Sequence, residues 1–376
     1  MGQQRKHFLS KILKQIFMGT ACTKQPKEYF KYGSYENIVL KARDGINIGA
    51  ALFKPEEVNK DTKFVIFLHG SGTNRDDIST AGQIKYFVSD NYVLLIPDYR
   101  DFGDSEGEFT RETVNLDVLA SFDFLINNYE AKSISVIAFS FGTTISAEYI
   151  KFIHESKNLK ISNHPVKNNL IFCNHPVKNN SIFCNHPVKN NLIFCNHPVK
   201  NNLIFCNHPV KNNSIFCNHP VKNNLIFCNH PVKNNSIFCN HPVKNNSIFC
   251  NNRYHITDFT EAYIPDKLIL LAPFSSFPKL MSEFKLVRFL KYFVPKIWNV
   301  ITDDFMYDTI NNLEFYDPSK LYLLHGTHDR LIKISHSIDI KNKFQCCLKE
   351  IETDHDRILV NHEVWKVIKD MLKGEI

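Results

Sequence analysis

From Glu36 the chain alternates hydrophobic and polar residues in two short runs, "ENIVLKA" and "INIGAALFKP". Alternation with a period of two predicts strands with one buried face. The runs are joined by Asp44-Gly45, and an Asp-Gly pair between two such runs predicts a tight turn. We therefore expect a β-hairpin at the start of the globular part.

Five later segments are short unbroken hydrophobic runs, which is typical of strands buried on both faces of a parallel sheet. They read "KFVIFLHG", "YVLLIPDYR", "SISVIAFS", "KLILLAP" and "KLYLLHG". Helical spacing lies between and after them, in "TVNLDVLASFDFLINN" and in the closing "ILVNHEVWKVIKDMLK". Alternating strands and helices predict the α/β class with a mainly parallel central sheet.

A tandem repeat interrupts this rhythm at residues 163–250, where the unit NHPVKNN(L/S)IFC occurs eight times. The pattern continues after it, so residues 32–162 and 251–376 are interpreted as one domain with an insert. We expect the insert to be mainly disordered, with "NLIFCN" as a weak strand that could stack or aggregate. Cysteine and histidine recur every 11 residues, but the paired spacing of zinc ligands is absent. No metal or cofactor is therefore expected, and a metal-binding array is the alternative.

The formal charge of +7 is distributed unevenly. The repeats hold eight lysines and no acid, which leaves −1 for the rest of the chain. Residues 1–31 form a basic segment with a local charge of +6, so the remaining body carries about −7. This distribution does not favour nucleic acid as a partner.

The basic segment begins with a helical pattern that places its apolar residues on one face: Phe8, Leu9, Ile12, Leu13, Ile16 and Phe17. Such a helix is typical of a membrane interface, so we expect peripheral membrane binding through residues 5–18. The run is too short to span a bilayer. Packing against the domain and a transit peptide are the alternatives.

Eleven cysteines give an odd number, and eight of them lie in the repeats. This pattern does not suit a disulfide framework and favours a reducing compartment. We expect the cytoplasm or the cytoplasmic face of a membrane, endomembranes included. Four glycosylation sequons keep the secretory pathway open as an alternative; they begin at Asn179, Asn212, Asn234 and Asn245.

Candidate chemistry centres on Ser140, which lies between a predicted buried strand and a predicted helix in "SISVIAFSFGTTISA". A small-x-Ser-x-Gly pattern in this setting predicts a sharp turn that exposes the serine hydroxyl beside a helix N-terminus. The alternative is an ordinary helix-capping serine.

A nucleophilic serine needs a base and a group that orients the base. Asp329 follows the strand "KLYLLHG", and His355 lies in the loop before the closing helix. We therefore predict Ser140, Asp329 and His355 as nucleophile, acid and base. Three other histidines could supply a base, but we expect them in ordinary structural settings: His328 beside the acid, His336 on a helix surface, and His362 inside the closing helix.

Developing negative charge on a carbonyl oxygen requires hydrogen-bond donors. The backbone N–H groups of Ser71, in "FLHGSGTN", and of Phe141 are the predicted pair. His69 is expected to shape this turn and to take no part in chemistry.

Six strings occur in this order: "FLHGSGTN", "PDYRDFGDSEG", "AFSFG", "LAPF", "HGTHD" and "TDHD". Together they resemble the α/β-hydrolase superfamily, and more narrowly its membrane-associated monoacylglycerol and lysophospholipid lipases, over residues 36–157 and 263–374. The resemblance implies the α/β-hydrolase fold and the same five site residues. Two positions depart from the family pattern: Ala138 stands where glycine is commoner, and Asp101 stands where the turn usually has glycine.

Residues 274–316 follow the sixth strand, where this fold carries cap segments. Their apolar residues alternate with Lys and Arg, which suits an acyl chain or a membrane surface. A cap packed on its own core is the alternative.

The sequence thus predicts a serine hydrolase of carboxylic esters, with a lipid ester or a small ester as substrate. An acyl-protein thioesterase or peptidase is the second enzymatic interpretation, because the same machinery cleaves all three bonds. A noncatalytic membrane adaptor with partner-binding repeats is the non-enzymatic one. The oligomeric state stays open.

Overall fold

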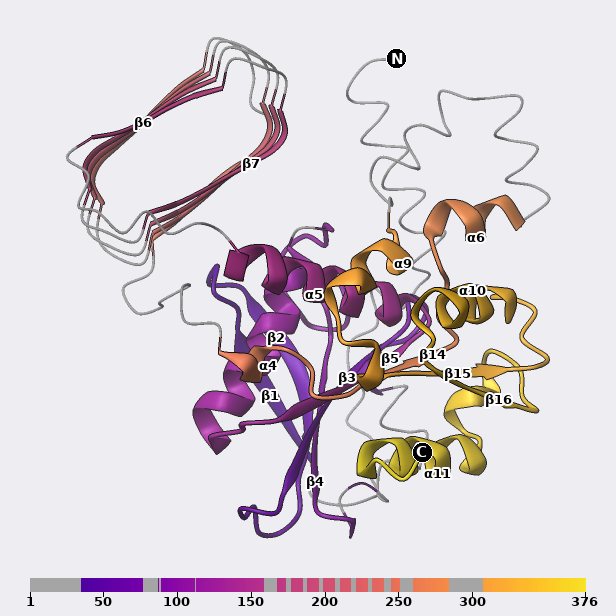
Figure 1. Ribbon diagram of the computed structural model, residues 1–376. Coiled ribbons are helices and arrows are strands. Elements are labelled where there is room, and N and C mark those ends of the chain that lie inside the picture. Colours follow the sequence, from indigo (N-terminus) through magenta and orange to yellow (C-terminus); the bar gives the residue numbers. More distant parts are fainter. Residues whose placement is uncertain are drawn as a thin grey trace. The chain divides into compact units, whose positions relative to one another are not determined.

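The computed structural model describes residues 35–76, 87, 89–111, 113–158, 260–283 and 307–376, together with the backbone of the strands between residues 168 and 250 (Figure 1). The predicted N-terminal helix and the middle of the predicted cap lie outside these residues. By its contacts the chain divides into two compact units. One comprises residues 1–42, 46–154 and 260–376, here called the sheet unit; the other comprises 43–45 and 155–259, here called the repeat unit.

The sheet unit is built on an eight-stranded sheet of order β1-β2-β4-β3-β5-β14-β15-β16. The pairs β1–β2 and β2–β4 are antiparallel, and every other pair is parallel. The β1–β2 pairing confirms the predicted hairpin, with Gly45 at a φ of 86° in its turn. The strands are β1 (Tyr35–Lys41), β2 (Asn47–Phe53), β3 (Lys63–Leu68), β4 (Tyr92–Pro97), β5 (Ile134–Phe139), β14 (Leu268–Leu271), β15 (Leu321–Gly326) and β16 (Cys347–Ile351).

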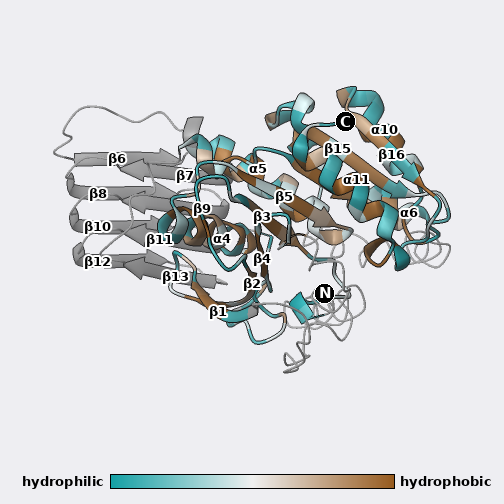
Figure 2. Ribbon diagram, turned by 90° about the horizontal axis from the view of Figure 1, so that it is seen from below, coloured by the Kyte–Doolittle hydropathy of each residue, from teal (hydrophilic) through white to brown (hydrophobic). Residues whose placement is uncertain are grey.

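Helices connect the strands as the sequence pattern predicted, and each described helix has buried residues. They are α4 (Val114–Tyr129), α5 (Phe141–Asn158), α6 (Phe277–Glu283), α9 (Thr309–Asn312), α10 (Ser335–Phe344) and α11 (His362–Lys373). Short 3₁₀ turns are η2 (Glu261–Tyr263), η3 (Leu313–Phe315), η4 (Pro318–Lys320) and η5 (Arg357–Leu359). The central strands are strongly hydrophobic, whereas the helices also carry hydrophilic segments (Figure 2).

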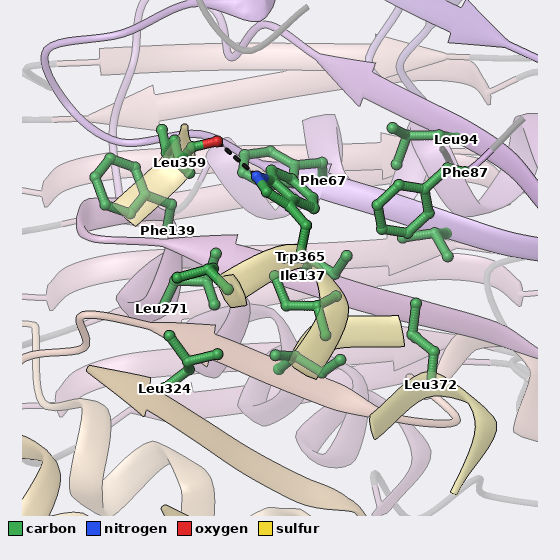
Figure 3. Close-up of a cluster of buried hydrophobic side chains, with 14 of the residues drawn as sticks. Phe67, Phe87, Leu94, Ile137, Phe139, Leu271, Leu324, Leu359, Trp365 and Leu372 are labelled. Carbon is green, nitrogen blue, oxygen red and sulfur yellow. Dashed lines mark hydrogen bonds between the residues drawn. The ribbon is translucent and has the colours of Figure 1, made fainter. Parts of the chain in front are cut away.

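The closing helix α11 covers one face of the sheet through Trp365. Its indole ring lies 6.2 Å from the Phe67 ring and 5.4 Å from the Phe87 ring, measured between centroids. The indole N–H donates to the carbonyl oxygen of Leu359 at 2.6 Å, so the polar atom of this buried side chain has its partner (Figure 3). Burying this ring fixes α11, and with it the preceding loop that carries His355.

The repeat unit differs from the expected mainly disordered insert, because each of the eight copies contributes a strand. The strands are β6 (Asn168–Cys173), β7 (Val177–Cys184), β8 (Val188–Cys195), β9 (Val199–Cys206), β10 (Val210–Cys217), β11 (Val221–Cys228), β12 (Val232–Cys239) and β13 (Asn245–Cys250). Alternate strands pair in parallel and form two four-stranded sheets, β12-β10-β8-β6 and β13-β11-β9-β7. The segment "NLIFCN" forms strands, as its sequence predicted. Repetition gives each strand a neighbour of nearly the same sequence.

Candidate active site

Ser140 lies at the abrupt turn between β5 and α5, as the sequence predicted. Its φ is +50°, a left-handed conformation that is uncommon for a residue with a side chain. The Ser140 N–H donates to the Leu271 carbonyl at 2.9 Å, and the Thr143 N–H donates to the Ser140 carbonyl at 3.0 Å. The neighbouring strand and the new helix therefore hold the turn from both sides.

The turn depends on two glycines that allow backbone segments to approach closely. A Cβ at Gly142 would lie 2.3 Å from the Leu68 carbonyl oxygen, so the start of α5 lies directly on the end of β3. A Cβ at Gly70 would lie 3.4 Å from Ser140 Cβ. The loop after β3 consequently lies against the nucleophile turn.

His355 lies between Ser140 and Asp329. Its Nε2 is 3.1 Å from Ser140 Oγ, and its Nδ1 is 2.6 Å from Asp329 Oδ2. Asp329 follows β15 and His355 follows β16, two neighbouring parallel strands whose carboxyl ends share an edge with the end of β5. The structure therefore brings together all three residues that the sequence selected from distant segments.

The Asp329 carboxylate is fixed in place by the backbone that follows it. Its Oδ1 accepts hydrogen bonds from the N–H groups of Leu331 at 2.9 Å and Ile332 at 2.8 Å. The other oxygen faces His355 Nδ1, which must donate because an ionised carboxylate only accepts. This arrangement leaves a lone pair on His355 Nε2 directed at the Ser140 hydroxyl.

The predicted oxyanion donors lie on the two segments that flank Ser140. Phe141 is the first residue of α5, where backbone N–H groups have no partner within the helix. Ser71 follows Gly70 in the loop that packs against the Ser140 turn. Both predicted donors therefore lie on segments next to the Ser140 turn.

An arginine clamp that sequence reasoning missed anchors the loop after β3. The Arg75 N–H and guanidinium donate to Asp98 at 2.7 and 2.6 Å, and the guanidinium also donates to Asp104 at 2.6 and 2.9 Å. Arg75 is only 1% exposed. Hydrogen bonding to Arg75 lowers the pKa of Asp104, while burial raises the pKa of Asp98 to about 7 against the pull of Arg75. No local pattern identifies such a clamp, because its members come from three separate loop positions.

His69 has the structural setting that the sequence predicted for it. Its Nδ1 lies 2.8 Å from the Gly70 carbonyl oxygen, and its ring centroid lies 4.2 Å from that of Tyr99. Complete burial lowers the pKa of His69 to about 4, so the imidazole is neutral near neutral pH.

Both departures from the family pattern are accommodated. Asp101 adopts a φ of 68°, the conformation for which glycine is usual, and its carboxylate accepts a hydrogen bond from the Phe109 N–H at 2.8 Å. Ala138 is fully buried in β5, paired with Leu68 on one side and Leu270 on the other. The Asp101 turn thus keeps a defined geometry without glycine.

One of the rival histidines corrects the sequence interpretation. His336 was expected on a helix surface, but it is fully buried, with Nδ1 2.8 Å from Ser275 Oγ. Burial lowers its pKa to about 4. His328 is exposed, and His362 is the first residue of α11 and also exposed. Helical periodicity alone did not reveal that the His336 face of α10 packs against the segment after β14.

A cavity lies beside the chain segments that carry Asp329 and His355. This cavity of about 510 Å³ is lined by residues next to Asp329 and His355 in the chain, including His328, Thr353 and Asp354. At the start of the predicted cap only α6 is described, and at its end Tyr307 packs edge-on against Phe141, with ring centroids 5.3 Å apart. Within the part of the chain that is described, no three His, Cys, Asp or Glu side chains are grouped as metal ligands.

Comparison with solved structures identifies the architecture as the α/β-hydrolase fold. The chain is similar to an esterase from Pyrococcus furiosus, with a TM-score of 0.50 and 13% identity over 93% of this chain and 97% of that one. It is also similar to an α/β hydrolase from Vibrio vulnificus, with a TM-score of 0.55 and 11% identity over 97% and 93% of the two chains. The mainly parallel sheet and the predicted fold are thereby confirmed.

Sequence comparison is less informative. No family model matches the chain. A multifunctional-autoprocessing repeats-in-toxin protein of Vibrio vulnificus is 24% identical over 127 residues, which is 32% of this chain. The chain spans only 2% of the length of that relative.

Proposed function

We propose that this protein is a serine hydrolase that cleaves carboxylic esters through an acyl-enzyme on Ser140. The observation that carries the proposal is the continuous hydrogen-bonded series Ser140–His355–Asp329, at 3.1 and 2.6 Å. The order Ser, Asp, His along the chain is that of α/β hydrolases. The fold of the neighbouring structures is compatible with this chemistry.

The proposed reaction begins when His355 Nε2 accepts the proton of the Ser140 hydroxyl as Oγ attacks the ester carbonyl. Asp329 stabilises the imidazolium that forms and keeps Nδ1 protonated. The same proton then passes from Nε2 to the departing alkoxide, which leaves an acyl group on Ser140. Water, deprotonated by His355, attacks this acyl group and releases the carboxylic acid.

In this proposal the N–H groups of Ser71 and Phe141 donate hydrogen bonds that stabilise the negative charge on the carbonyl oxygen. The N-terminus of α5 adds its positive end of the helix dipole at the same place. The arginine clamp of Arg75, Asp98 and Asp104 holds the loop that carries Ser71. These donors act only on the tetrahedral intermediate, so they stabilise the transition state more than the substrate.

We infer that the substrate is a lipid ester, with monoacylglycerol or lysophospholipid as the class to test first. Large apolar side chains are exposed on the two loops that carry the site: Leu331, two residues after Asp329, is 49% exposed, and Val360, five residues after His355, is 54% exposed. Apolar and basic residues also alternate through the predicted cap. Exposed apolar groups beside a reaction centre suit an acyl chain or a membrane surface.

Membrane attachment through residues 5–18 is part of the same proposal, on a cytoplasmic membrane face. The described helices contribute no candidate for a bilayer-spanning segment. The amphipathic pattern of the N-terminal segment supports attachment at the surface.

The test is labelling with a fluorophosphonate probe, followed by hydrolysis of a panel of monoacylglycerols, lysophospholipids, acyl thioesters and peptides. Ser140→Ala should abolish labelling, and His355→Ala should reduce hydrolysis by several orders of magnitude, whereas the matched variant His362→Ala should leave both unchanged. Retained labelling in Ser140→Ala would refute the nucleophile. Loss of activity in folded His362→Ala equal to that in His355→Ala would refute the base.

A further inference from the structure

The stacked strands of the repeat unit form ladders in which each residue lies opposite a copy of itself, except where Leu and Ser alternate in the repeat. Ile171 pairs with Ile193, and Cys173 pairs with Cys195. The same register continues through Cys217 to Cys239, and the second sheet repeats it from Cys184 to Cys250. One step of the ladder corresponds to two repeats, so each layer of the stack consists of one strand from each sheet (Figure 1).

Both sheets end in strands that have one neighbour among the described strands. The first layer consists of β6 and β7, and the last consists of β12 and β13. An edge strand presents N–H and C=O groups that can pair with a further strand. Within the stack, such pairing occurs in one parallel register only.

The sequence of the last layer makes a second copy of this chain the matching partner for that edge. Each repeat has the same eleven residues except for the Leu/Ser position, so the first layer of another molecule presents the same residues as an internal layer. Stacking repeat arrays normally end in atypical capping repeats. The first and last copies here have the same sequence as internal ones.

We propose that the repeat unit mediates head-to-tail self-association, in which β12 and β13 of one molecule pair in parallel with β6 and β7 of the next. This contact joins two different surfaces and leaves the same two surfaces free at the ends, so it extends without closing into a linear assembly. The proposal is independent of the hydrolase function.

The connections to the sheet unit are each nine residues long. Residues 159–167 link α5 to β6, and residues 251–259 link β13 to Thr260. Nine residues can span about 30 Å. The four layers of the stack rise by only about 14 Å in total. Each connection is therefore longer than the stack is high, so joining the chain at both ends does not by itself place a segment over either edge strand.

Lysine makes the association sensitive to salt. Lys178 lies between Val177 and Asn179, whose ladder partners are Val199 and Asn201, so Lys178 is in register with Lys200. Within the described strands the ladder thus places like charges opposite each other, which opposes pairing. Salt shortens the screening length from about 10 Å at 0.1 M to about 3 Å at 1 M. Assembly should therefore increase with salt, the reverse of an interface held by opposite charges.

The first test measures assembly of the full chain by analytical ultracentrifugation under reducing conditions, at several protein and salt concentrations. The native chain should show a mean mass that rises with protein concentration and with salt. The matched control keeps residues 163–250 at the same composition but in shuffled order, so charge, cysteine content and hydrophobicity are unchanged and the register is lost. The shuffled chain should remain a monomer. A native chain that stays monomeric, or a shuffled chain that assembles equally, overturns the proposal.

The second test measures direction by cross-linking. All cysteines except Cys173 and Cys239 are replaced by serine. Within one molecule these two lie at opposite ends of a ladder, about 14 Å apart, too far for a disulfide. Head-to-tail pairing brings Cys239 of one molecule to about 5 Å from Cys173 of the next, within disulfide range.

Oxidation by a copper–phenanthroline catalyst should therefore give a series of covalent oligomers, and a control with Cys173 alone should give monomers. The new bond joins two thiol sulfurs, and oxygen accepts the two electrons and two protons. Dimers from the Cys173 control in place of the series would indicate head-to-head contact and refute the proposed direction.

Discussion

Replacing Gly142 by alanine tests the link between the close packing of the nucleophile turn and activity. The added Cβ would lie 2.3 Å from the Leu68 carbonyl oxygen and 2.7 Å from the His69 carbonyl oxygen. Both obstacles are backbone atoms at the end of β3, so no side-chain rotation relieves them. Because real Cβ contacts essentially never fall under 3.0 Å, the two segments must separate by at least 0.7 Å.

Two effects follow from this displacement. Overpacking of this size costs about 1–3 kcal/mol in the free energy of unfolding. The segments that separate carry Ser140 on one side and the loop with Ser71 on the other, so the nucleophile and an oxyanion donor move apart. A misplacement of about 1 Å at reacting groups can lower turnover on the order of 100-fold. We expect both losses in Gly142→Ala.

The assay combines urea unfolding with kcat/KM for a water-soluble ester at a temperature where the variant is folded. Gly72→Ala is the matched control, since a Cβ there meets nothing within 4 Å although the residue adjoins Ser71. That variant should retain stability to within about 0.5 kcal/mol. Wild-type stability and wild-type kcat/KM in Gly142→Ala together would refute the close approach. Lost stability with intact kcat/KM would show that the strain relaxes away from Ser140.

Four further outcomes are expected. Arg75→Met should cost about 3–5 kcal/mol in unfolding free energy, because it leaves Asp98 buried without its cation; an unchanged urea midpoint would contradict this. Burial lowers the pKa of His336 from 6.5 to about 4, so at this site the unfolded chain binds more protons between these values and the residue lowers stability as pH decreases from 6.5 to 4; relative to wild type, the His336→Asn variant should therefore gain stability over this range, and an unchanged difference between the two would contradict it. Replacing residues 163–250 by a short Gly/Ser linker should leave ester kinetics unchanged, because β5 and β14 pair directly on the two sides of the insert; a large fall in kcat/KM would contradict this. Removing residues 1–20 should move the protein from membrane to soluble fractions without altering kcat/KM for a soluble ester; an unchanged membrane fraction would contradict the role of that segment.

The fold and the three central site residues could be predicted because their signals are local. Ser140 is identified by the strand, the glycine and the helix around it, and Asp329 and His355 each follow a strand end, the location that a parallel sheet makes common to all of them. The three residues could therefore be expected near one another from their order along the chain alone. The hairpin at Gly45 was predictable for the same reason.

Features that depend on tertiary contacts could not be predicted in this way. The clamp on Asp98 and Asp104 requires Arg75 to reach across from another loop, and only the folded positions reveal this. The burial of His336 depends on Ser275, which is 61 residues away. In the repeats, near-identical low-complexity copies predict disorder when each unit is considered alone. A repeat forms a strand there when a nearly identical strand pairs with it. A prediction made from one segment at a time does not include this pairing.

The place of the repeats in the chain explains how such an insert is compatible with the proposed site. It interrupts the crossover between β5 and β14, yet these strands still pair directly, with Val136 opposite Leu268. Side chains also join the segments before and after the insert. The Tyr149 hydroxyl of α5 donates to the Tyr263 carbonyl at 3.1 Å, and the Tyr263 hydroxyl donates to Asp123 at 2.8 Å. These contacts join the segments on both sides of the insert independently of its length. Ser140 lies at the start of α5, and a helix rises 1.5 Å per residue, so His154 lies about 20 Å from the turn. Changes in repeat number therefore act on the end of α5 that is remote from Ser140, which allows the insert to lengthen or shorten without moving the reacting groups.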